Sequence, residues 1–316
     1  MTPVDLSVWQ GRVDAAEGAL GRRWHQVMQP LDGRTAAGTI TLLGFACDAG
    51  VARNHGRVGA AEGPRAIRHA LRNMPLHECT QLADGGDVVC DGDALEAAQQ
   101  ALAAVVAGEL DAQRFPLVLG GGHEMAWGSF SGLAAYLAGR SGAPRIGIVN
   151  FDAHFDLRRD VRATSGTPFL QIASDCAARG WPFRYACLGV SRYSNTEALF
   201  ARAQEHDVMW RLDEAVSVAG TSPALSAFTA SVDHLYLTFC LDVLPAAVAP
   251  GVSAPAARGV GLDVLEPLVD AVCATGKVRL ADIAEMNPRF DIDGRTAAVA
   301  ARLAARIANG VVRARR

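Results

Sequence analysis

The sequence predicts an α/β fold in three layers, in which an open and mostly parallel sheet carries helices on both faces. Its short apolar runs are continuous rather than alternating, which is typical of parallel strands buried on both faces. Stretches of helical period separate these runs, and such alternation of strands and helices favours a parallel sheet. In folds of this kind, ligands bind beyond the carboxyl ends of the strands. Functional residues are therefore expected where the apolar runs end.

Six apolar runs are the expected strands. They read TITLLGFA (39–46), FPLVLGG (115–121), RIGIVNFDA (145–153), FRYACLGV (183–190), HLYLTFCLDV (234–243) and KVRLADIAEMN (277–287). Three Ala/Leu-rich stretches, at 94–110, 195–206 and 295–312, are the expected helices. Residues 1–38 precede the first run, and we expect them to form an N-terminal arm packed on a single catalytic domain over residues 39–316.

Composition narrows the class of function. The net charge of the 316 residues is only -3, so no broad attraction to nucleic acid or to an anionic membrane is expected. No stretch approaches the roughly 20 apolar residues that span a bilayer. The N-terminal MTPVDLSVWQGRVD lacks the apolar centre of a signal peptide. Seven scattered cysteines without a CxxC pair predict reduced thiols in the cytoplasm.

Acids, histidines and a cysteine follow four of the predicted strands. These residues are His123 after the second run, Asp152, His154 and Asp156 at the end of the third, Cys240 and Asp242 in the fifth, and Asp282 and Glu285 in the sixth. At a spacing of two along an extended chain, Asp152, His154 and Asp156 point to the same side. Carboxylates this close resist ionisation unless cations neutralise them. The sequence therefore predicts a divalent-metal site at one edge of the sheet.

The ligand types favour manganese, because oxygen-rich ligation with two imidazoles suits Mn²⁺ better than structural zinc. More ligands than one ion needs indicate two ions, roughly 3.5–4 Å apart, of the kind that activate water for hydrolysis. A lone histidine or acid at a strand end is usually a cap or a solvated residue, and a glycine run usually marks a turn. Their joint occurrence at four strand ends is much harder to explain in that way.

Three ordered motifs resemble the metal signatures of the ureohydrolases, the arginase and agmatinase family. The motifs are GGGHE (120–124), NFDAHFD (150–156) and CLDVLPAAVAPGVSAP (240–255), and the segments at 50–68 and 282–288 are also similar to the family. The resemblance runs from about Gly44 to Arg302. It implies an arginase-like fold with an eight-stranded sheet, a manganese-dependent hydrolase and a homo-oligomer.

Position by position, the resemblance implies that His123 and Asp156 bind one manganese ion and that His154 and Asp242 bind the other, with Asp152 bridging both. The family's second bridging aspartate falls on Cys240. A thiolate can bind a metal but is softer than manganese prefers, so occupancy of the second ion site depends on this residue. The alternative for Cys240 is a buried, inert thiol.

The substrate end of the site is also predicted from the resemblance. Glu285 matches the acid that grips the planar nitrogen group of the substrate, and a carboxylate can accept paired N–H bonds. The histidine that arginases and agmatinases use as a proton donor is replaced by Ser165, which cannot shuttle a proton near pH 7. We therefore expect Asp156, as a metal-bound relay, to return a proton to the leaving nitrogen.

Further segments resemble one branch of the family, the formimidoylglutamases. They are TSGTPF (164–169), GVSRYSNT (189–196) and DGRTAAVAARL (293–303). The resemblance implies hydrolysis of N-formimidoyl-L-glutamate to L-glutamate and formamide, a step of histidine degradation. The candidates to bind the substrate carboxylates are Arg57, Arg158, Arg159 and Asn195, although any one of these residue types is more often found at an ordinary surface position.

Two alternatives stay open. The substrate could be another guanidino compound, such as agmatine or guanidinobutyrate. In a different class, the protein could be a catalytically weak metal-binding or assembly protein, which Cys240 and Ser165 favour. The intact set of predicted ligands and Glu285 favour the enzyme.

Overall fold

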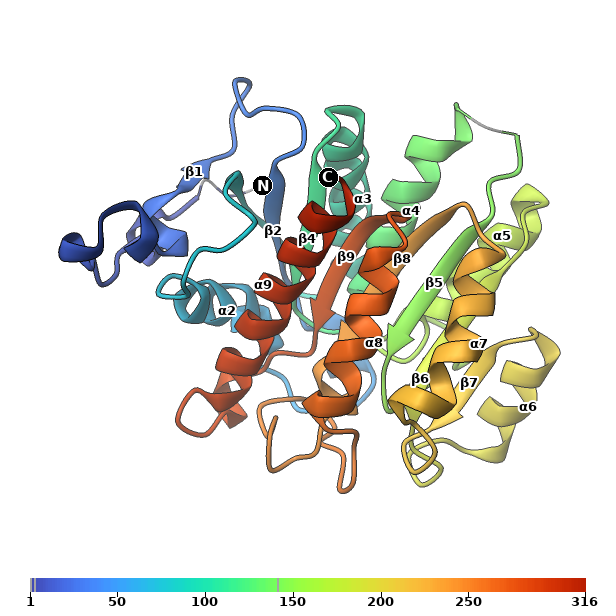
Figure 1. The fold of residues 1–316 in the computed structure, drawn as a ribbon. Coiled ribbons are helices and arrows are strands. Elements are labelled where there is room, and N and C mark those ends of the chain that lie inside the picture. Colours follow the sequence, from blue (N-terminus) through green and yellow to red (C-terminus); the bar gives the residue numbers. More distant parts are fainter. Residues whose placement is uncertain (1, 3, 141) are drawn as a thin grey trace.

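The computed structural model describes residues 2, 4–140 and 142–316 (Figure 1). Within these residues, nine strands form one sheet in the order β1-β3-β2-β4-β9-β8-β5-β6-β7, and every paired neighbour is parallel. The strands are β1 (Met28–Pro30), β2 (Ile40–Ala46), β3 (Leu82–Val89), β4 (Phe115–Gly120), β5 (Ile146–Phe151), β6 (Arg184–Val190), β7 (Met209–Leu212), β8 (His234–Cys240) and β9 (Val278–Ala284).

Helices cover both faces of the sheet, which makes three layers (Figure 1). Helices α2 (Gly63–Leu71), α7 (Val218–Ala230), α8 (Leu262–Ala274) and α9 (Arg295–Ala314) pack on one face. Helices α3 (Leu95–Asp111), α4 (Met125–Ala138), α5 (Pro168–Arg179) and α6 (Glu197–Glu205) pack on the other. The shorter elements are α1 (Ala49–Arg53) and the 3₁₀ turns η1 (Leu6–Trp9), η2 (Ala15–Gly21), η3 (Trp24–Gln26), η4 (Ala60–Glu62), η5 (Leu241–Val243) and η6 (Pro288–Phe290).

The predicted α/β fold is confirmed, but the expected number of eight strands is wrong by one. Strands β2 to β9 account for eight, and the ninth, β1, comes from the N-terminal arm and pairs with β3. Three residues ending in a proline leave no apolar pattern to detect. Pro30 is tolerated there because β1 is an edge strand, where one side of the ladder is unpaired.

Two strands of the body escaped the apolar pattern for different reasons. Strand β7 has four half-buried residues at the opposite edge of the sheet. Strand β3 reads LADGGDVV, in which two glycines and two acids interrupt the apolar run. Its Asp84 is nevertheless buried, because the Arg68 guanidinium donates to both carboxylate oxygens at 2.8 and 2.9 Å. A buried ion pair of this kind depends on a partner that is distant in sequence, so local patterning cannot reveal it.

The N-terminal arm is fastened to this ion pair. Trp9 Nε1 donates to Asp84 Oδ2 at 2.8 Å, and Trp24 is buried. The boundary predicted between residues 38 and 39 itself stays a prediction. Among the described residues, none of the helices combines the length and apolar character that crossing a membrane would need.

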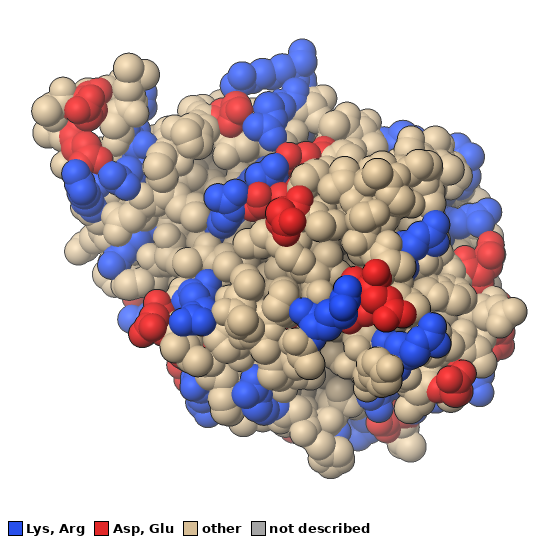
Figure 2. Space-filling model, turned by 60° about the horizontal axis from the view of Figure 1, so that its bottom comes forward, with Lys and Arg blue, Asp and Glu red and all other residues tan. Residues whose placement is uncertain are grey.

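Strands β4, β9, β8 and β5 are neighbours at the centre of the sheet, and their residues are almost wholly buried. Their carboxyl ends point to the bottom of Figure 1, as the arrow of β5 shows. Figure 2 brings this side of the molecule forward and shows basic and acidic side chains interspersed on a mostly uncharged surface. The central strands therefore deliver whatever follows them to one edge.

Candidate metal centre

The predicted metal ligands meet at the carboxyl ends of three of these central strands, β4, β5 and β8. His123 follows β4, Asp152 follows β5, Cys240 ends β8, and Asp242 lies in the turn η5 that continues β8. His123 Nδ1 lies 2.9 Å from Asp152 Oδ2 and 3.0 Å from Asp156 Oδ2. His154 Nδ1 lies 3.6 Å from Asp152 Oδ1 and 3.0 Å from Asp242 Oδ2. Asp152 therefore stands between the two histidines.

The D-x-H-x-D segment reaches this geometry differently from the prediction. Strand β5 ends at Phe151, so the expected extended chain over Asp152, His154 and Asp156 is wrong. The segment bends instead, with a positive φ of 49° at Asp156. The His154 N–H donates to Asp152 Oδ1 at 2.7 Å and holds the bend. A left-handed conformation at a non-glycine residue is costly and persists where the surroundings enforce it.

The glycine run before His123 is required by close packing. A β-carbon at Gly121 would lie 2.0 Å from the carbonyl oxygen of Cys47, and the Gly121 N–H already donates to the Phe45 carbonyl at 2.9 Å. A β-carbon at Gly122 would lie 2.0 Å from the carboxylate of Glu124. Only glycine lets the chain pass between these groups and turn His123 toward Asp152.

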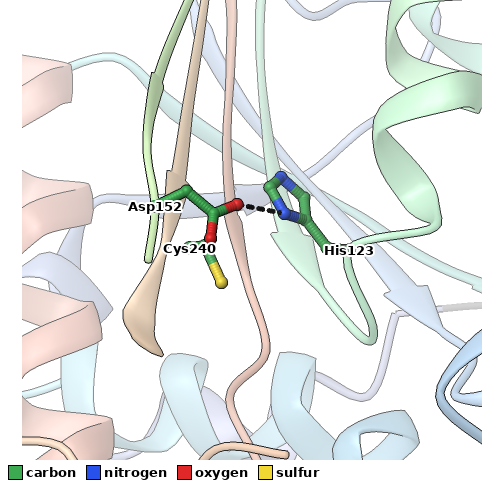
Figure 3. Close-up of side chains that lie close together, drawn as sticks. All are labelled: His123, Asp152 and Cys240. Atoms are coloured by element: carbon green, nitrogen blue, oxygen red, sulfur yellow. Dashed lines mark ion pairs between the residues drawn. The ribbon is translucent and has the colours of Figure 1, made fainter. Parts of the chain in front are cut away.

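Two overlapping sets of potential ligands share Asp152. His123, Asp152 and Cys240 form one set, and Asp152, His154 and Asp242 form the other, with the ligand atoms of each set within 4.8 Å of one another. Figure 3 shows the Cys240 sulfur beside the Asp152 carboxylate, with the His123 ring facing the same carboxylate. The arrangement suits two ions that share one carboxylate. It also places the Cys240 sulfur within the first set, where the family's second aspartate was expected.

The pKa values of the two histidines show whether the site favours positive charge, as a metal-binding site should. Burial lowers the pKa of His123, but the hydrogen bonds that its ring donates to Asp152 and Asp156 outweigh burial and raise this pKa well above its ordinary value. Burial likewise lowers the pKa of His154, whereas the charge of Asp242 and the bonds to both aspartates raise it. Without metal, protons on the two imidazoles thus neutralise the carboxylates. Divalent ions would supply the same neutralisation through the same atoms, so the residues fit a metal pair.

The acids at the site respond to burial and to one another. Burial raises the pKa of Asp152, but both histidines outweigh it and hold this pKa below its ordinary value. Burial and then the charge of Asp152 raise the pKa of Asp156 to about 6. Burial also raises the pKa of the Cys240 thiol well above its ordinary value, so this residue is a thiol until a metal binds.

Glu285 lies beside the metal ligands, directly after β9. Its Oε1 accepts from the His123 backbone N–H at 3.0 Å, and its Oε2 accepts from the Ser253 N–H at 3.3 Å. The residue has a positive φ of 73°, and its side chain is buried. Burial raises the pKa of Glu285 to about 7. Its backbone strain and altered pKa are features that gather at functional sites.

The four residues expected at the substrate carboxylates have different surroundings. Arg57 donates to the carbonyl oxygens of Pro250, Val252 and Ser253 and stacks on Phe290, so it clamps a loop. Arg158 and Arg159 are exposed and line a depression of about 440 Å³.

Asn195 is buried, and its amide group is hydrogen-bonded to the loop that carries Asp152, His154 and Asp156. Its Oδ1 accepts from the Phe155 N–H at 3.1 Å, and its Nδ2 donates to the carbonyls of Ala153 and Ser191 at 2.9 and 2.8 Å. The structure therefore gives Asn195 a bracing role, and direct contact with substrate stays a prediction. Ser165 is also buried, and its Oγ accepts from Asn54 Nδ2 at 3.1 Å.

Several residues at the site were not identified from the sequence as site residues. Asn150 Nδ2 donates to Asp152 Oδ2 at 3.0 Å, and Thr238 Oγ1 lies 2.9 Å from His123 Nε2. Both are polar residues inside otherwise apolar strands, and their positions two residues before Asp152 and Cys240 were the only local signal. Ser253 contributes through its backbone, for which the sequence holds no signal.

A model of the arginase family matches residues 38–309 of the chain. The formimidoylglutamase of Ralstonia nicotianae is 62% identical over 315 residues, which are 98% of this chain and 97% of that protein. The formimidoylglutamase of Aeromonas hydrophila is 58% identical over 95% of this chain and 96% of that protein.

Solved structures are also similar. The Trypanosoma cruzi formiminoglutamase with Mn²⁺₂ superposes with a TM-score of 0.77 at 25% identity, covering 89% of this chain and 96% of that one. The formimidoylglutamase of Bacillus subtilis superposes with a TM-score of 0.79 at 22% identity, over 90% of each chain, which is a likeness of fold.

Proposed function

The chain belongs to the arginase family, and we propose that it is a manganese-dependent hydrolase that converts N-formimidoyl-L-glutamate to L-glutamate and formamide. The observation that carries the proposal is the pair of ligand sets that share Asp152, with the Glu285 carboxylate next to them. The formimidoylglutamase relatives at 62% and 58% identity support this substrate over other amidines.

The residues of the site would hold two ions. His123, Asp152 and Asp156 would hold one, His154, Asp152 and Asp242 the other, and Cys240 lies close enough to His123 and Asp152 to join the first. Manganese, when bound, supplies Lewis acidity and lowers the pKa of water. Asn150 and the His154 N–H orient the shared Asp152 carboxylate, which leaves it little freedom to turn away.

Glu285 would position the reacting end of the substrate. Two backbone N–H groups fix its carboxylate, and the remaining lone pairs can accept N–H bonds from the cationic formimino group. Asp156 would relay a proton to the leaving nitrogen, because its side chain is 12% exposed whereas that of Asp152 is fully buried. A proton at Asp156 can therefore reach the substrate side of the site.

The glutamate end of the substrate carries two carboxylates and needs cationic partners. Arg158 fits this role better than Arg57, whose donors already bond to backbone carbonyls. The Arg158 side chain lies over Gly166, where a β-carbon would come within 2.8 Å of Arg158 Cδ. Arg159 lines the same depression and is the second cation available.

Two further properties complete the proposal. All seven cysteines are free thiols, four of them in strands or helices of the sheet layers, which supports a reducing cytoplasmic location. Membership of the arginase family supports a homo-oligomer, and light scattering coupled to gel filtration would measure the number of subunits.

The test is turnover by the purified protein reconstituted with Mn²⁺. We expect formamide from N-formimidoyl-L-glutamate, and much slower urea release from agmatine or guanidinobutyrate. The Asp242→Asn variant should lose this turnover, while the Asp207→Asn variant, whose side chain is 96% exposed, retains it. Faster turnover of a guanidino compound would contradict the choice of substrate.

The alternative of a catalytically weak metal-binding protein is favoured by Cys240 and Ser165. Absence of turnover on every amidine, in protein that carries two manganese ions per chain, would support that alternative. A Cys240→Asp variant that gains activity would further show that the thiol limits catalysis.

A further inference from the structure

A set of buried polar groups lies behind His123, on the side of its ring that faces away from the other ligands. His123 Nε2 lies 2.9 Å from Thr238 Oγ1. Its second nitrogen, Nδ1, faces Asp152 and Asp156 and receives no hydrogen bond from any donor in the described part of the chain. A neutral imidazole carries one proton, and the nitrogen without it has the lone pair that binds a metal.

The Thr238 hydroxyl is itself held from behind. Thr238 on β8 pairs with Asp282 in the register of β8 and β9, and both side chains are fully buried. The Tyr236 hydroxyl, two residues earlier on β8, donates to Asp282 Oδ2 at 2.5 Å. The hydroxyls of Thr238 and Ser129 lie near this carboxyl, and within the described residues its Oδ1 has no other hydrogen-bond partner. Within the described residues, His123 is itself the cationic side chain near this buried carboxyl group.

The strand period puts these groups on one line. Tyr236, Thr238 and Cys240 alternate along β8, so all three project from the same face of the sheet. Asp282 projects from that face on the neighbouring strand, and His123 follows β4 on the other side of β9. The line therefore runs from the protein interior, through Asp282 and Thr238, to His123 and the proposed ion.

We propose that Thr238, held by Asp282 and Tyr236, is a positioning residue that keeps the proton of His123 on Nε2 and turns its Nδ1 toward the metal. In this arrangement Nε2–H donates to Thr238 Oγ1, and the Thr238 hydroxyl in turn donates to the Asp282 carboxyl. A histidine fixed in this way needs no reorientation to bind a cation, and its bond to the interior strengthens it as a ligand.

The consequence is selective, because in the described part of the chain His123 is the one of the two histidines whose Nε2 contacts a side-chain hydroxyl. His154 belongs to the other set, and its side chain is 20% exposed, whereas that of His123 is 2% exposed. Loss of the Thr238 hydroxyl should therefore weaken the ion held by His123 and leave the ion held by His154 and Asp242 largely unchanged. A residue that only filled space would affect neither ion selectively.

The test is a manganese titration of the metal-free, full-length protein, followed by calorimetry and by the electron paramagnetic resonance of free Mn²⁺. Thr238→Val has nearly the same shape as threonine but lacks the hydroxyl, and it should weaken one of the two ions by about 10–100-fold. Thr238→Ser keeps the hydroxyl and should bind both ions like the wild type. Thr41→Val is the matched control, since Thr41 is buried in β2 and its Oγ1 has no partner among the described residues.

Wild-type affinity for both ions in Thr238→Val would overturn the proposal, as would an equal loss in Thr238→Ser. Should Thr238→Val fail to fold, Asp282→Asn decides the matter, because it keeps the shape of the buried group. The proposal predicts a selective loss of one ion there too, and unchanged binding would overturn it. The inference rests on the proposed metal site. A wild-type protein without manganese affinity would refute the proposed function, whereas normal wild-type binding with an unaffected Thr238→Val refutes only this inference.

Discussion

Replacing Asn195 by alanine should distinguish a structural role of this residue from direct contact with the substrate. The buried amide makes three hydrogen bonds to backbone groups, two of them in the loop that carries Asp152, His154 and Asp156 and the third to the Ser191 carbonyl after β6. At about 1 kcal/mol net for each bond, Asn195→Ala should lower the free energy of unfolding by roughly 3 kcal/mol. For a chain of this size, that corresponds to a fall in Tm of about 6–10 °C. The loss is structural, so it should appear without any substrate.

The loop also holds metal ligands, which links this change to function. With Phe155 N–H and the Ala153 carbonyl unpaired, the bend around His154 loosens and manganese affinity should fall. Calorimetric scans of metal-free protein would measure the change in Tm, and steady-state kinetics with saturating Mn²⁺ would measure kcat and KM. Tyr193→Ala is the control, because that side chain lies in the same segment and is 96% exposed. An unchanged Tm with a strongly raised KM would refute the bracing role and favour direct substrate contact.

Three further changes have distinct expected outcomes. Glu285→Gln removes a charged acceptor for the formimino group. Because a hydrogen bond to a charged group contributes about 1.5–3 kcal/mol, kcat/KM should fall by about 10–150-fold. An undiminished kcat/KM in steady-state assays would contradict this role. Burial raises the pKa of Glu124 to about 8. In metal-free protein, the contribution of this carboxyl group to the free energy of unfolding is therefore complete at a pH below its ordinary pKa of 4.5, and it is lost as the pH rises through about 8. Urea unfolding of wild type and Glu124→Gln should show the stability of the wild type falling relative to the variant over that range, and a constant difference would contradict it. Gly121→Ala should destabilise the protein by about 2–3 kcal/mol and impair manganese binding, because the new β-carbon meets a backbone oxygen that cannot move aside. Gly92→Ala is the control, because its β-carbon would enter open space and only the positive φ would be strained.

The sequence predicted the six strands that form most of the sheet because their burial is nearly continuous. FPLVLGG was expected over 115–121 and β4 covers Phe115–Gly120. Strand β3 was missed because its acids are stabilised by Arg68 and Trp9, which are distant in sequence. The order of strands in the sheet then explains the site, because β4, β9, β8 and β5 are neighbours in the sheet although they are far apart along the chain.

The candidate ligands could be found from spacing and from motifs, but their supports could not. Asp152 and His154 were recognisable as a pair two residues apart, although the reason given, an extended chain, was wrong because β5 ends before them. The role of Asn195 depends on which backbone groups lie beside it after folding. Asp282 was expected among the acids at the edge, but it lies inside β9, where the register between two strands pairs it with Thr238. Such contacts exist only in three dimensions, and an isolated polar residue in a strand does not specify its partner.

The claim that two ions share Asp152 is tested most directly by manganese-edge anomalous diffraction from crystals of the manganese-loaded protein. We expect two anomalous peaks per chain, both within bonding distance of the Asp152 carboxylate, one also beside His123 and Asp156 and the other beside His154 and Asp242. A map with no peak at Asp152, or with ions bound elsewhere on the chain, would contradict it.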